Sequence, residues 1–205
     1  MRSGRFITTL AVMVVVSLLV ISAVGPAASH GGRWLGAKLT TNTQPSNSNE
    51  GINCGNDADV AEPCTFVMRE ALGYSGNRRH ETKSPRNGVI KKIKLIASAP
   101  GSFRLQIAKI KPGTTKAKIV RNGPKINYKG QPDPDAPYVI ETFKVNIPIK
   151  KGQSLAVKTR KLRAMRCNSG GGATLTYQKP LKVGGKFKQT SGTDGCFMLI
   201  RGILK

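Results

Sequence analysis

The clearest alternation of apolar and polar positions lies in the middle of the chain, at residues 88–111. In its second half, residues 103–108, apolar side chains alternate with polar or small ones, a period of two that is typical of a strand with one buried face. The first half, residues 89–96, changes phase near the lysine pair Lys91-Lys92, which predicts a β-bulge in that region. Because the turn-forming residues 98–102 separate the two halves, the pattern predicts a central β-hairpin.

Further strands are expected on both sides of this stretch. A long alternating run at residues 138–149 is followed by a turn at 150–153 and an apolar run at 154–159, which we interpret as a second hairpin. The strand expected at residues 116–121 ends at the turn residues 122–124. Shorter apolar runs predict additional strands at residues 34–39, 173–177 and 196–204, whereas residues 65–72 fit either a strand or one to two helical turns.

The number of short strands sets the fold class. No amphipathic segment with a helical period is longer than about three turns, the usual helix length. Eight or nine short strands separated by Gly- and Pro-containing turns predict an all-β protein, an antiparallel sandwich or barrel. Of these we favour a jelly-roll-like β-sandwich. Residues 129–137 contain too many prolines for a central strand and are expected to form a loop.

The N-terminal segment has a different composition. Arg2 and Arg5 precede an apolar run at residues 6–24, and small residues follow at 27–29, the pattern of a secretory signal peptide. An uncleaved membrane anchor is the alternative, because the run is long enough to cross about 30 Å of hydrocarbon. We favour cleavage, since the small residues directly follow the run and no basic cluster comes after it.

Cleavage after residue 29 would leave a single β-sandwich domain, residues 30–205, whose first part, 30–53, we expect to be partly flexible. Four cysteines in an exported chain predict two disulfides, and the sequential pairing Cys54–Cys64 and Cys167–Cys196 is favoured among the three possible. Loop entropy gives these bridges about 2.8 and 3.6 kcal/mol, so the second is expected to stabilise more.

The chain is strongly basic, with 34 Lys and Arg against 10 Asp and Glu and a formal charge of +24. Such a charge indicates attraction to anionic polymers and does not depend on the fold. Three clusters stand out, at residues 78–86, 158–166 and 179–188. The alternative is that these charged side chains keep the outward faces of the sheets hydrated and protect the sheet edges from pairing with other chains. The candidate anion-binding residues are Lys158, Arg160, Lys161, Arg163, Arg166, Arg78 and Arg79.

Other chemistry has less support. If cleavage makes His30 the first residue, it could form a copper site with His80, an arrangement similar to that of the secreted lytic polysaccharide monooxygenases. Neither a Ser-His-Asp nor a Cys-His arrangement is supported, so we expect no catalytic residue, metal or cofactor. The candidate metal ligands are these two histidines for copper and the loop acids Asp57, Asp59, Glu62, Asp133 and Asp135 for calcium, although these acids could instead pair with nearby lysines. A carbohydrate-binding module would need exposed aromatic side chains, for which the candidates are Trp34, Tyr74, Tyr128, Tyr138 and Tyr177.

Four short motifs carry a family resemblance: CTFV at residues 64–67, SPRNGVI at 84–90, IPIKKGQSLA at 147–156 and TDGC at 193–196. With these motifs, the chain resembles a group of uncharacterised secreted bacterial β-sandwich proteins. The resemblance implies an exported sandwich and transfers no catalytic residue.

These patterns together predict a secreted, strongly cationic, non-catalytic β-sandwich without a membrane span in its mature part. Its expected partners are anionic polymers of the cell envelope or extracellular space: cell wall, polysaccharide or extracellular nucleic acid. Aromatic residues are only 5% of the chain, which argues against a base-stacking platform for nucleic acid. The alternatives are a carbohydrate-binding module and a copper-dependent oxidase that uses an N-terminal histidine.

Overall fold

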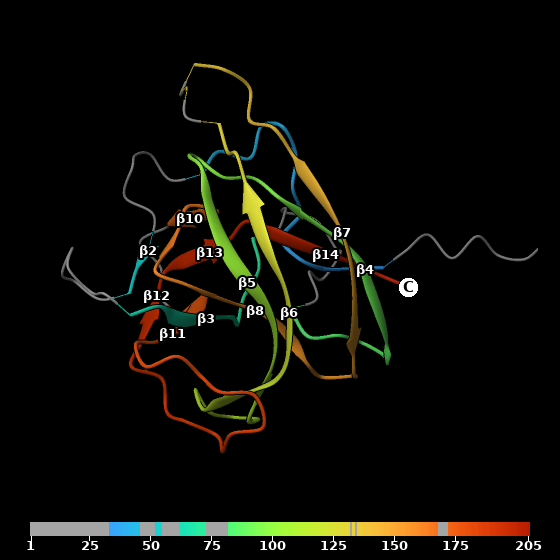
Figure 1. Ribbon diagram of the computed structural model, residues 1–205, viewed down its shortest axis with the longest axis vertical. Coiled ribbons are helices and arrows are strands. Elements are labelled where there is room, and N and C mark those ends of the chain that lie inside the picture. Colours follow the sequence, from blue (N-terminus) through green and yellow to red (C-terminus); the bar gives the residue numbers. More distant parts are fainter. Residues whose placement is uncertain are drawn as a thin grey trace, which may run out of the picture. The chain divides into compact units, whose positions relative to one another are not determined.

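The computed structural model describes residues 33–45, 52–54, 62–72, 82–131, 133, 135–167 and 172–205 (Figure 1). The expected signal peptide, His30, Arg78, Arg79 and His80 lie outside the described residues. Within the described part of the chain there is no helix with the length and hydrophobicity needed to cross a bilayer.

The described residues form fourteen strands. They are β1 (Arg33–Gly36), β2 (Ile52–Asn53), β3 (Cys64–Met68), β4 (Gly88–Leu95), β5 (Gly101–Ile110), β6 (Ala117–Tyr128), β7 (Glu141–Ile149), β8 (Ser154–Thr159), β9 (Lys161–Leu162), β10 (Met165–Cys167), β11 (Thr174–Tyr177), β12 (Gly192–Asp194), β13 (Cys196–Met198) and β14 (Ile200–Leu204). Five of them, β2, β9, β10, β12 and β13, are only two or three residues long, which explains why the sequence predicts fewer.

Two large sheets contain most of these strands. One has the order β1-β14-β4-β7 and the other β12-β11-β3-β8-β5-β6, and two short ribbons, β2-β9 and β10-β13, accompany them. All of these strand pairs are antiparallel. The described residues contain no helix, so the prediction of an all-β, antiparallel sandwich is confirmed. Residues 65–68, for which the sequence fits either a strand or helical turns, belong to strand β3.

The main core lies between the two sheets. Alternate residues of β4, including Ile93 and Leu95, belong to the same buried cluster as Phe103, Leu105 and Ile107 of β5. Since these two strands lie in different sheets, the cluster joins the inner faces of both. Burial of apolar surface, at about 25 cal/mol per Å², therefore holds the sheets together. The polar residues that alternate with this set are left facing outward.

Neither expected hairpin is present. β4 pairs with β14 and β7, whereas β5 pairs with β6 and β8, so residues 96–100 connect one sheet to the other (Figure 1). In the same way, the turn at residues 150–153 joins β7 of one sheet to β8 of the other. A short turn between two half-buried strands serves a hairpin and an inter-sheet connection equally well. The hydrophobic pattern shows which face is buried and not which strand is the hydrogen-bonded partner.

The bulge predicted near Lys91 is confirmed. Ile203 and Leu204 of β14 face Lys92 and Ile90, so Lys91 is the extra residue on β4. This bulge restores the phase that buries both Ile90 and Ile93. Lys91 itself is exposed and donates a hydrogen bond from Nζ to Asn146 Oδ1 on β7 (2.6 Å).

The prediction of a turn at residues 122–124 is wrong. β6 continues through these residues to Tyr128, and a register shift against β5 absorbs them between Asn122 and Lys125. β6 is an edge strand: among the described strands its only neighbour is β5, at the end of the six-stranded sheet. Pro124, which has no N–H to donate, is therefore tolerated here as it would not be in a central strand.

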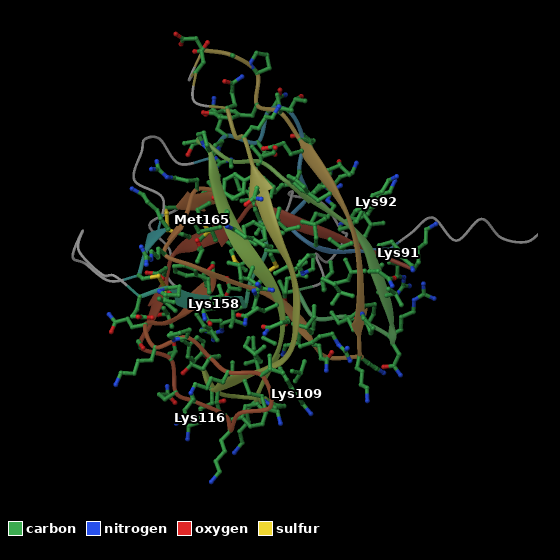
Figure 2. The ribbon with its side chains drawn as sticks, in the orientation of Figure 1. Lys91, Lys92, Lys109, Lys116, Lys158 and Met165 are labelled. Carbon is green, nitrogen blue, oxygen red and sulfur yellow. A yellow bond between two sulfur atoms is a disulfide. The ribbon has the colours of Figure 1, made fainter. Side chains whose placement is uncertain are left out.

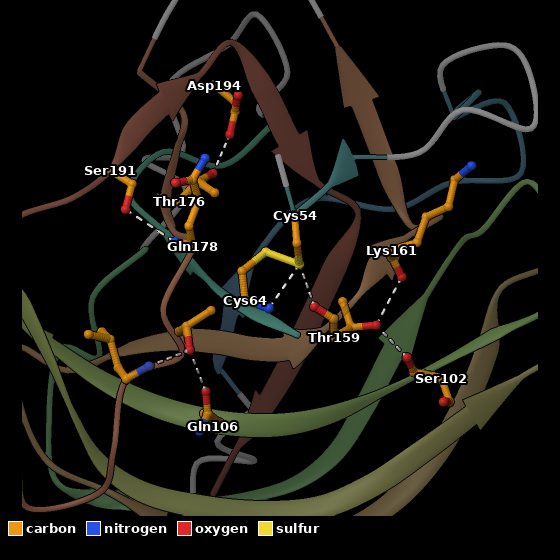
Figure 3. The surroundings of a disulfide bond; sticks show 12 residues. Cys54, Cys64, Ser102, Gln106, Thr159, Lys161, Thr176, Gln178, Ser191 and Asp194 are labelled. Atoms are coloured by element: carbon orange, nitrogen blue, oxygen red, sulfur yellow. Dashed lines mark hydrogen bonds between the residues drawn. A yellow bond between two sulfur atoms is a disulfide. The ribbon is translucent and has the colours of Figure 1, made fainter. Parts of the chain in front are cut away.

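Both predicted disulfides are present. Cys54–Cys64 is buried in the main core and joins the residue after β2 to the start of β3 (Figure 3). The Cys64 N–H donates to Cys54 Sγ (2.8 Å). Cys167 and Cys196 face each other across β10 and β13. The expected last strand is interrupted at Leu199, so its first part forms this ribbon and its second part, β14, joins the four-stranded sheet.

A long connection covers part of the outer face of the six-stranded sheet. Residues 178–191, named here the cover loop, lead from β11 to β12 and reach the edge strand β6 on the way. Val183 and Lys188 form isolated bridges with β6. Leu181 packs in a second apolar cluster with Val67 and other outward-facing residues of this sheet. The cover loop therefore shields an apolar patch that would otherwise face water.

Candidate anion-binding surface

Three cations from three adjacent strands lie in line on the six-stranded sheet. In the antiparallel register, Lys158 of β8 faces Arg104 of β5, and Arg104 in turn faces Lys125 of β6. Their chain neighbours, such as Leu105 and Val157, are buried in the main core, so the three cations point to the outer face. We name Lys158, Arg104 and Lys125 the cation row.

The cation row is an unfavourable arrangement for the isolated protein. Adjacent strands are about 4.8 Å apart. Like charges directly opposite each other on neighbouring strands destabilise a sheet, by an amount comparable to the roughly 0.2–1 kcal/mol that opposite charges contribute. The guanidinium of Arg104 donates from Nη1 to the carbonyl oxygen of Gly123 (3.2 Å), which uses one donor and brings no negative charge to the guanidinium.

Two of the described carboxylates make hydrogen bonds away from the cation row. Glu141 accepts the backbone N–H groups of Lys129 (3.0 Å) and Gly130 (2.8 Å). Asp194 accepts the hydroxyl of Thr176 (Figure 3). The positive field of the cation row can therefore attract an external anion, because these two carboxylates are turned to other partners.

The same juxtaposition recurs elsewhere on the sandwich. Lys109 of β5 faces Lys118 of β6, and on the four-stranded sheet Lys92 faces Lys144 and Lys94 faces Arg201. Figure 2 labels Lys109 near the end of the molecule where β5 and β6 join, and Lys92 beside β4. Cations therefore stand opposite one another on both large sheets.

Two of these cations also contact aromatic rings. The Lys118 Nζ lies 4.9 Å from the centre of the Phe187 ring in the cover loop. The Arg201 guanidinium lies 5.1 Å from the centre of the Trp34 ring and donates from Nε to the carbonyl oxygen of Ala37 (2.9 Å). These contacts hold the two half-buried side chains against the surface.

The structure separates the cations predicted from residues 158–166. The chain leaves the six-stranded sheet after Thr159, since β9 pairs with β2 and β10 pairs with β13. Lys158, Lys161 and Arg166 consequently lie in three different sheets, and Arg160 lies between β8 and β9. Only Lys158 belongs to the cation row. The predicted Arg78 and Arg79 lie outside the described residues.

Arg163 is partly buried rather than displayed. Its backbone N–H donates to the Tyr128 hydroxyl (3.3 Å), and its carbonyl oxygen accepts the Ser98 N–H (3.3 Å). Its Nη1 is buried without a hydrogen-bond partner among the described residues. Burial raises the pKa of Tyr128, although the hydrogen bond and positive charge of Arg163 act in the opposite direction. Arg163 is therefore a poor contact for a large polymer.

Sequence reasoning missed Arg104 and Lys125 because they belong to no local cluster. Arg104 occupies the polar phase of the alternating run 103–108, and this phase is the only signal that it faces outward. Its alignment with Lys158, 54 positions later in the chain, follows from the pairing of β5 with β8. A search for dense runs of Lys and Arg does not detect such an alignment.

The aromatic candidates have less structural support, and the metal candidates His30 and His80 lie outside the described residues. Tyr128, Tyr138 and Tyr177 are 4%, 8% and 2% exposed, so these three rings offer no open face to a sugar. Trp34 is partly buried and Tyr74 lies outside the described residues. Within the described part of the chain, no three His, Cys, Asp or Glu side chains are grouped as a metal site would require.

The chain matches no protein-family model, no curated protein and no solved structure.

Proposed function

We propose that this protein is a secreted, cationic, non-catalytic β-sandwich that associates with anionic polymers of the cell envelope or extracellular space. The observation that carries the proposal is the cation row, in which Lys158, Arg104 and Lys125 face one another across three strands. Their mutual repulsion is relieved when a polyanion lies across the strands. The repeated like-charge pairs on the four-stranded sheet support contact through more than one face.

Binding of this kind depends on charge more than on the identity of the polymer. Each ammonium or guanidinium group that neutralises a phosphate or carboxylate releases counterions, so affinity falls steeply with salt. The buried tyrosines leave few rings for stacking on bases or sugars. The candidate partners are therefore cell wall, polysaccharide and extracellular nucleic acid as classes of polyanion.

Two observations support secretion. The disulfides Cys54–Cys64 and Cys167–Cys196 are typical of an oxidising compartment. The sequence of residues 1–29 has the order of charge, apolar run and small residues that signal peptides share.

The test is retention of the mature protein on immobilised polyanions as a function of salt. We expect retention on a phosphate, a sulfate and a carboxylate polymer at about 50 mM salt, and release from all three by about 0.5 M, where the Debye length is only about 4 Å. A neutral polysaccharide is the control. Equal retention on that control, or no retention on any polyanion at low salt, would overturn the proposal.

Matched variants test the role of the cation row. The triple change Arg104→Gln, Lys125→Gln and Lys158→Gln removes three aligned charges. The control Lys111→Gln, Lys150→Gln and Lys151→Gln removes three exposed charges from turns. We expect the row variant to elute at lower salt than the control variant. Identical elution would show that only net charge matters and that the row makes no contact of its own.

A further inference from the structure

Tyr177 and the cover loop line an open cavity of about 560 Å³, and its lining is strongly basic. Four of its eleven lining residues are lysines: Lys179, Lys182, Lys186 and Lys188. None of the described residues that line it is acidic. The volume falls within the range of about 300–1,000 Å³ that small-molecule sites occupy. This cavity is separate from the cation row, none of whose members lines it.

The floor of the cavity is apolar and uncharged. Tyr177 and Leu181 line it, and both belong to the apolar cluster on the outer face of the six-stranded sheet. The Tyr177 hydroxyl donates to the carbonyl oxygen of Thr115 (2.7 Å), and burial raises the pKa of Tyr177 to about 12. The phenol therefore stays neutral at physiological pH. The cavity combines an apolar base with a cationic rim.

Backbone hydrogen bonds hold the rim in place. Lys188 donates to Ala117 (2.9 Å) and accepts from it (3.0 Å), which fixes the far side of the cover loop to β6. Gly184, whose φ of +74° suits glycine, donates to the carbonyl oxygen of Ile119 (3.1 Å). At the base, the Leu181 N–H donates to Thr65 Oγ1 (3.0 Å). A cavity anchored at both sides is largely formed before a ligand arrives, which reduces the entropy cost of binding.

The return of the cover loop to the sheet is fixed as well. Ser191 donates its backbone N–H to the carbonyl oxygen of Thr176 (2.9 Å) and accepts the Gln178 N–H on its hydroxyl (3.2 Å) (Figure 3). Gln189, another lining residue, donates from Nε2 to Thr115 Oγ1 (2.6 Å). Both ends of the cover loop and its middle are thus tied to strands or their connections. The four lysine side chains are exposed and free to turn toward a ligand.

We propose that this cavity binds a small organic phosphate, with at least two negative charges held by the lysines and a ring or apolar portion on Tyr177 and Leu181. The cationic lining consists of lysine without arginine. Lysine binds phosphate as a compact point charge, whereas arginine binds phosphate or carboxylate in a fixed bidentate geometry, so an all-lysine lining suits a highly charged ligand held without a fixed fork. A phosphate monoester carries about −1.5 to −2 at pH 7, so two of them match four ammonium groups.

The phosphate has two possible sources: a free metabolite or the phosphorylated end of a polymer. Glucose 1,6-bisphosphate represents the first and inorganic polyphosphate the second. Titration of the mature full-length domain by calorimetry, with neutral glucose as control, measures the affinity for each. We expect saturable binding of the bisphosphate and competition by polyphosphate for the same site. Failure of the bisphosphate to bind would overturn the proposal, even if polyphosphate adheres to the sheets.

Charge-matched variants separate the cavity from the general field. Lys182→Gln, Lys186→Gln and Lys188→Gln should weaken bisphosphate binding at least tenfold. Lys92→Gln, Lys94→Gln and Lys144→Gln remove the same charge from the four-stranded sheet and should change the affinity less than threefold. Equal losses in the two variants would show that binding reflects net charge alone and would overturn the proposal.

Two further measurements on the wild-type protein do not depend on how the variants fold. Amide chemical shifts should change on titration mainly at residues 177–191, and changes spread over both sheets would contradict the assignment. Affinity should fall as the pH drops below about 6, because the second ionisation of a phosphate monoester has a pKa near 6. Because this site and the cation row share no residue, failure of one proposal leaves the other intact.

Discussion

Lys158 on β8 and Arg104 on β5 lie directly opposite each other on adjacent antiparallel strands, although 54 positions separate them in the chain. Their Cβ atoms are held about 4.5–5.5 Å apart by the ladder. Two like charges at this separation oppose folding, and Lys125 extends the repulsion to a third strand. A surface that is optimised for stability alone would place a carboxylate at one of these positions.

Removal of this repulsion should stabilise the protein. We expect Lys158→Gln and Lys125→Gln each to raise the free energy of unfolding by about 0.2–1 kcal/mol at low salt, because a like-charge pair is lost. The gain should disappear near 0.5 M salt, where screening is strong. Lys150→Gln, an exposed turn position, is the matched control and should have little effect. Urea denaturation at both salt concentrations measures the free energy of unfolding of each variant relative to the wild type. If both row variants are less stable than the wild type at low salt, repulsion within the cation row does not destabilise the protein.

Arg163 offers a second test of electrostatics. Its Nη1 is buried and lacks a hydrogen-bond partner among the described residues, whereas its backbone makes the contacts with Tyr128 and Ser98. Arg163→Met keeps the backbone contacts and the apolar first part of the side chain but removes the buried donor. We expect the free energy of unfolding to stay the same or to rise by up to about 1 kcal/mol. A loss of more than about 1 kcal/mol would show that the guanidinium makes a stabilising contact.

The two disulfides should contribute in the opposite order to the one expected from loop length. Loop entropy favours Cys167–Cys196 by about 0.8 kcal/mol. However, Cys54 and Cys64 are 2% and 0% exposed, so replacing both by alanine also leaves space in the core. The loss of two buried atoms of this size costs about 1–3 kcal/mol, which exceeds the entropy difference.

The comparison uses two double variants, Cys54→Ala with Cys64→Ala and Cys167→Ala with Cys196→Ala. We expect the first to have the lower midpoint of urea denaturation. Peptide mapping without reduction should find the remaining bridge intact in each variant. A lower midpoint for the second variant would mean that loop entropy outweighs packing here.

Tyr177 predicts a specific loss of stability at alkaline pH. Its pKa is about 12 in the folded protein, above the value near 10 of an unfolded tyrosine. The folded state therefore keeps a proton that the unfolded state releases, and stability falls as the pH rises from 10 to 12. Below pH 10, Tyr177→Phe should lower the free energy of unfolding by about 0.5–1.5 kcal/mol, because the hydrogen bond to Thr115 is lost.

The difference between wild type and Tyr177→Phe isolates this group. Lysine deprotonation and the raised pKa of Tyr128 affect both proteins alike. We expect the stability advantage of the wild type to shrink between pH 10 and 12. Denaturant unfolding monitored by circular dichroism at pH 8, 10 and 11.5 measures the free energy of unfolding of both proteins. A constant difference between them over this range would show that ionisation of Tyr177 does not destabilise the folded state.

The amino-acid sequence by itself determined the local features of this protein. Alternation with a period of two located strands such as β5 and β7, since successive side chains of any strand point to opposite faces. The break in that alternation located the bulge at Lys91. Short separations between cysteines indicated the disulfide pairing, and residue counts gave the net charge.

Only the tertiary structure decided which strands are neighbours. Residues 88–111 form two strands, as the pattern predicts, but β4 and β5 belong to opposite sheets because contacts with distant strands outweigh the proximity of a short turn. Partner choice then fixed the register that aligns Lys158, Arg104 and Lys125, and it brought the cover loop onto β6 to form an open, lysine-lined cavity. Burial of a strand face is a local property of the sequence, whereas its hydrogen-bond partner depends on the packing of the whole chain.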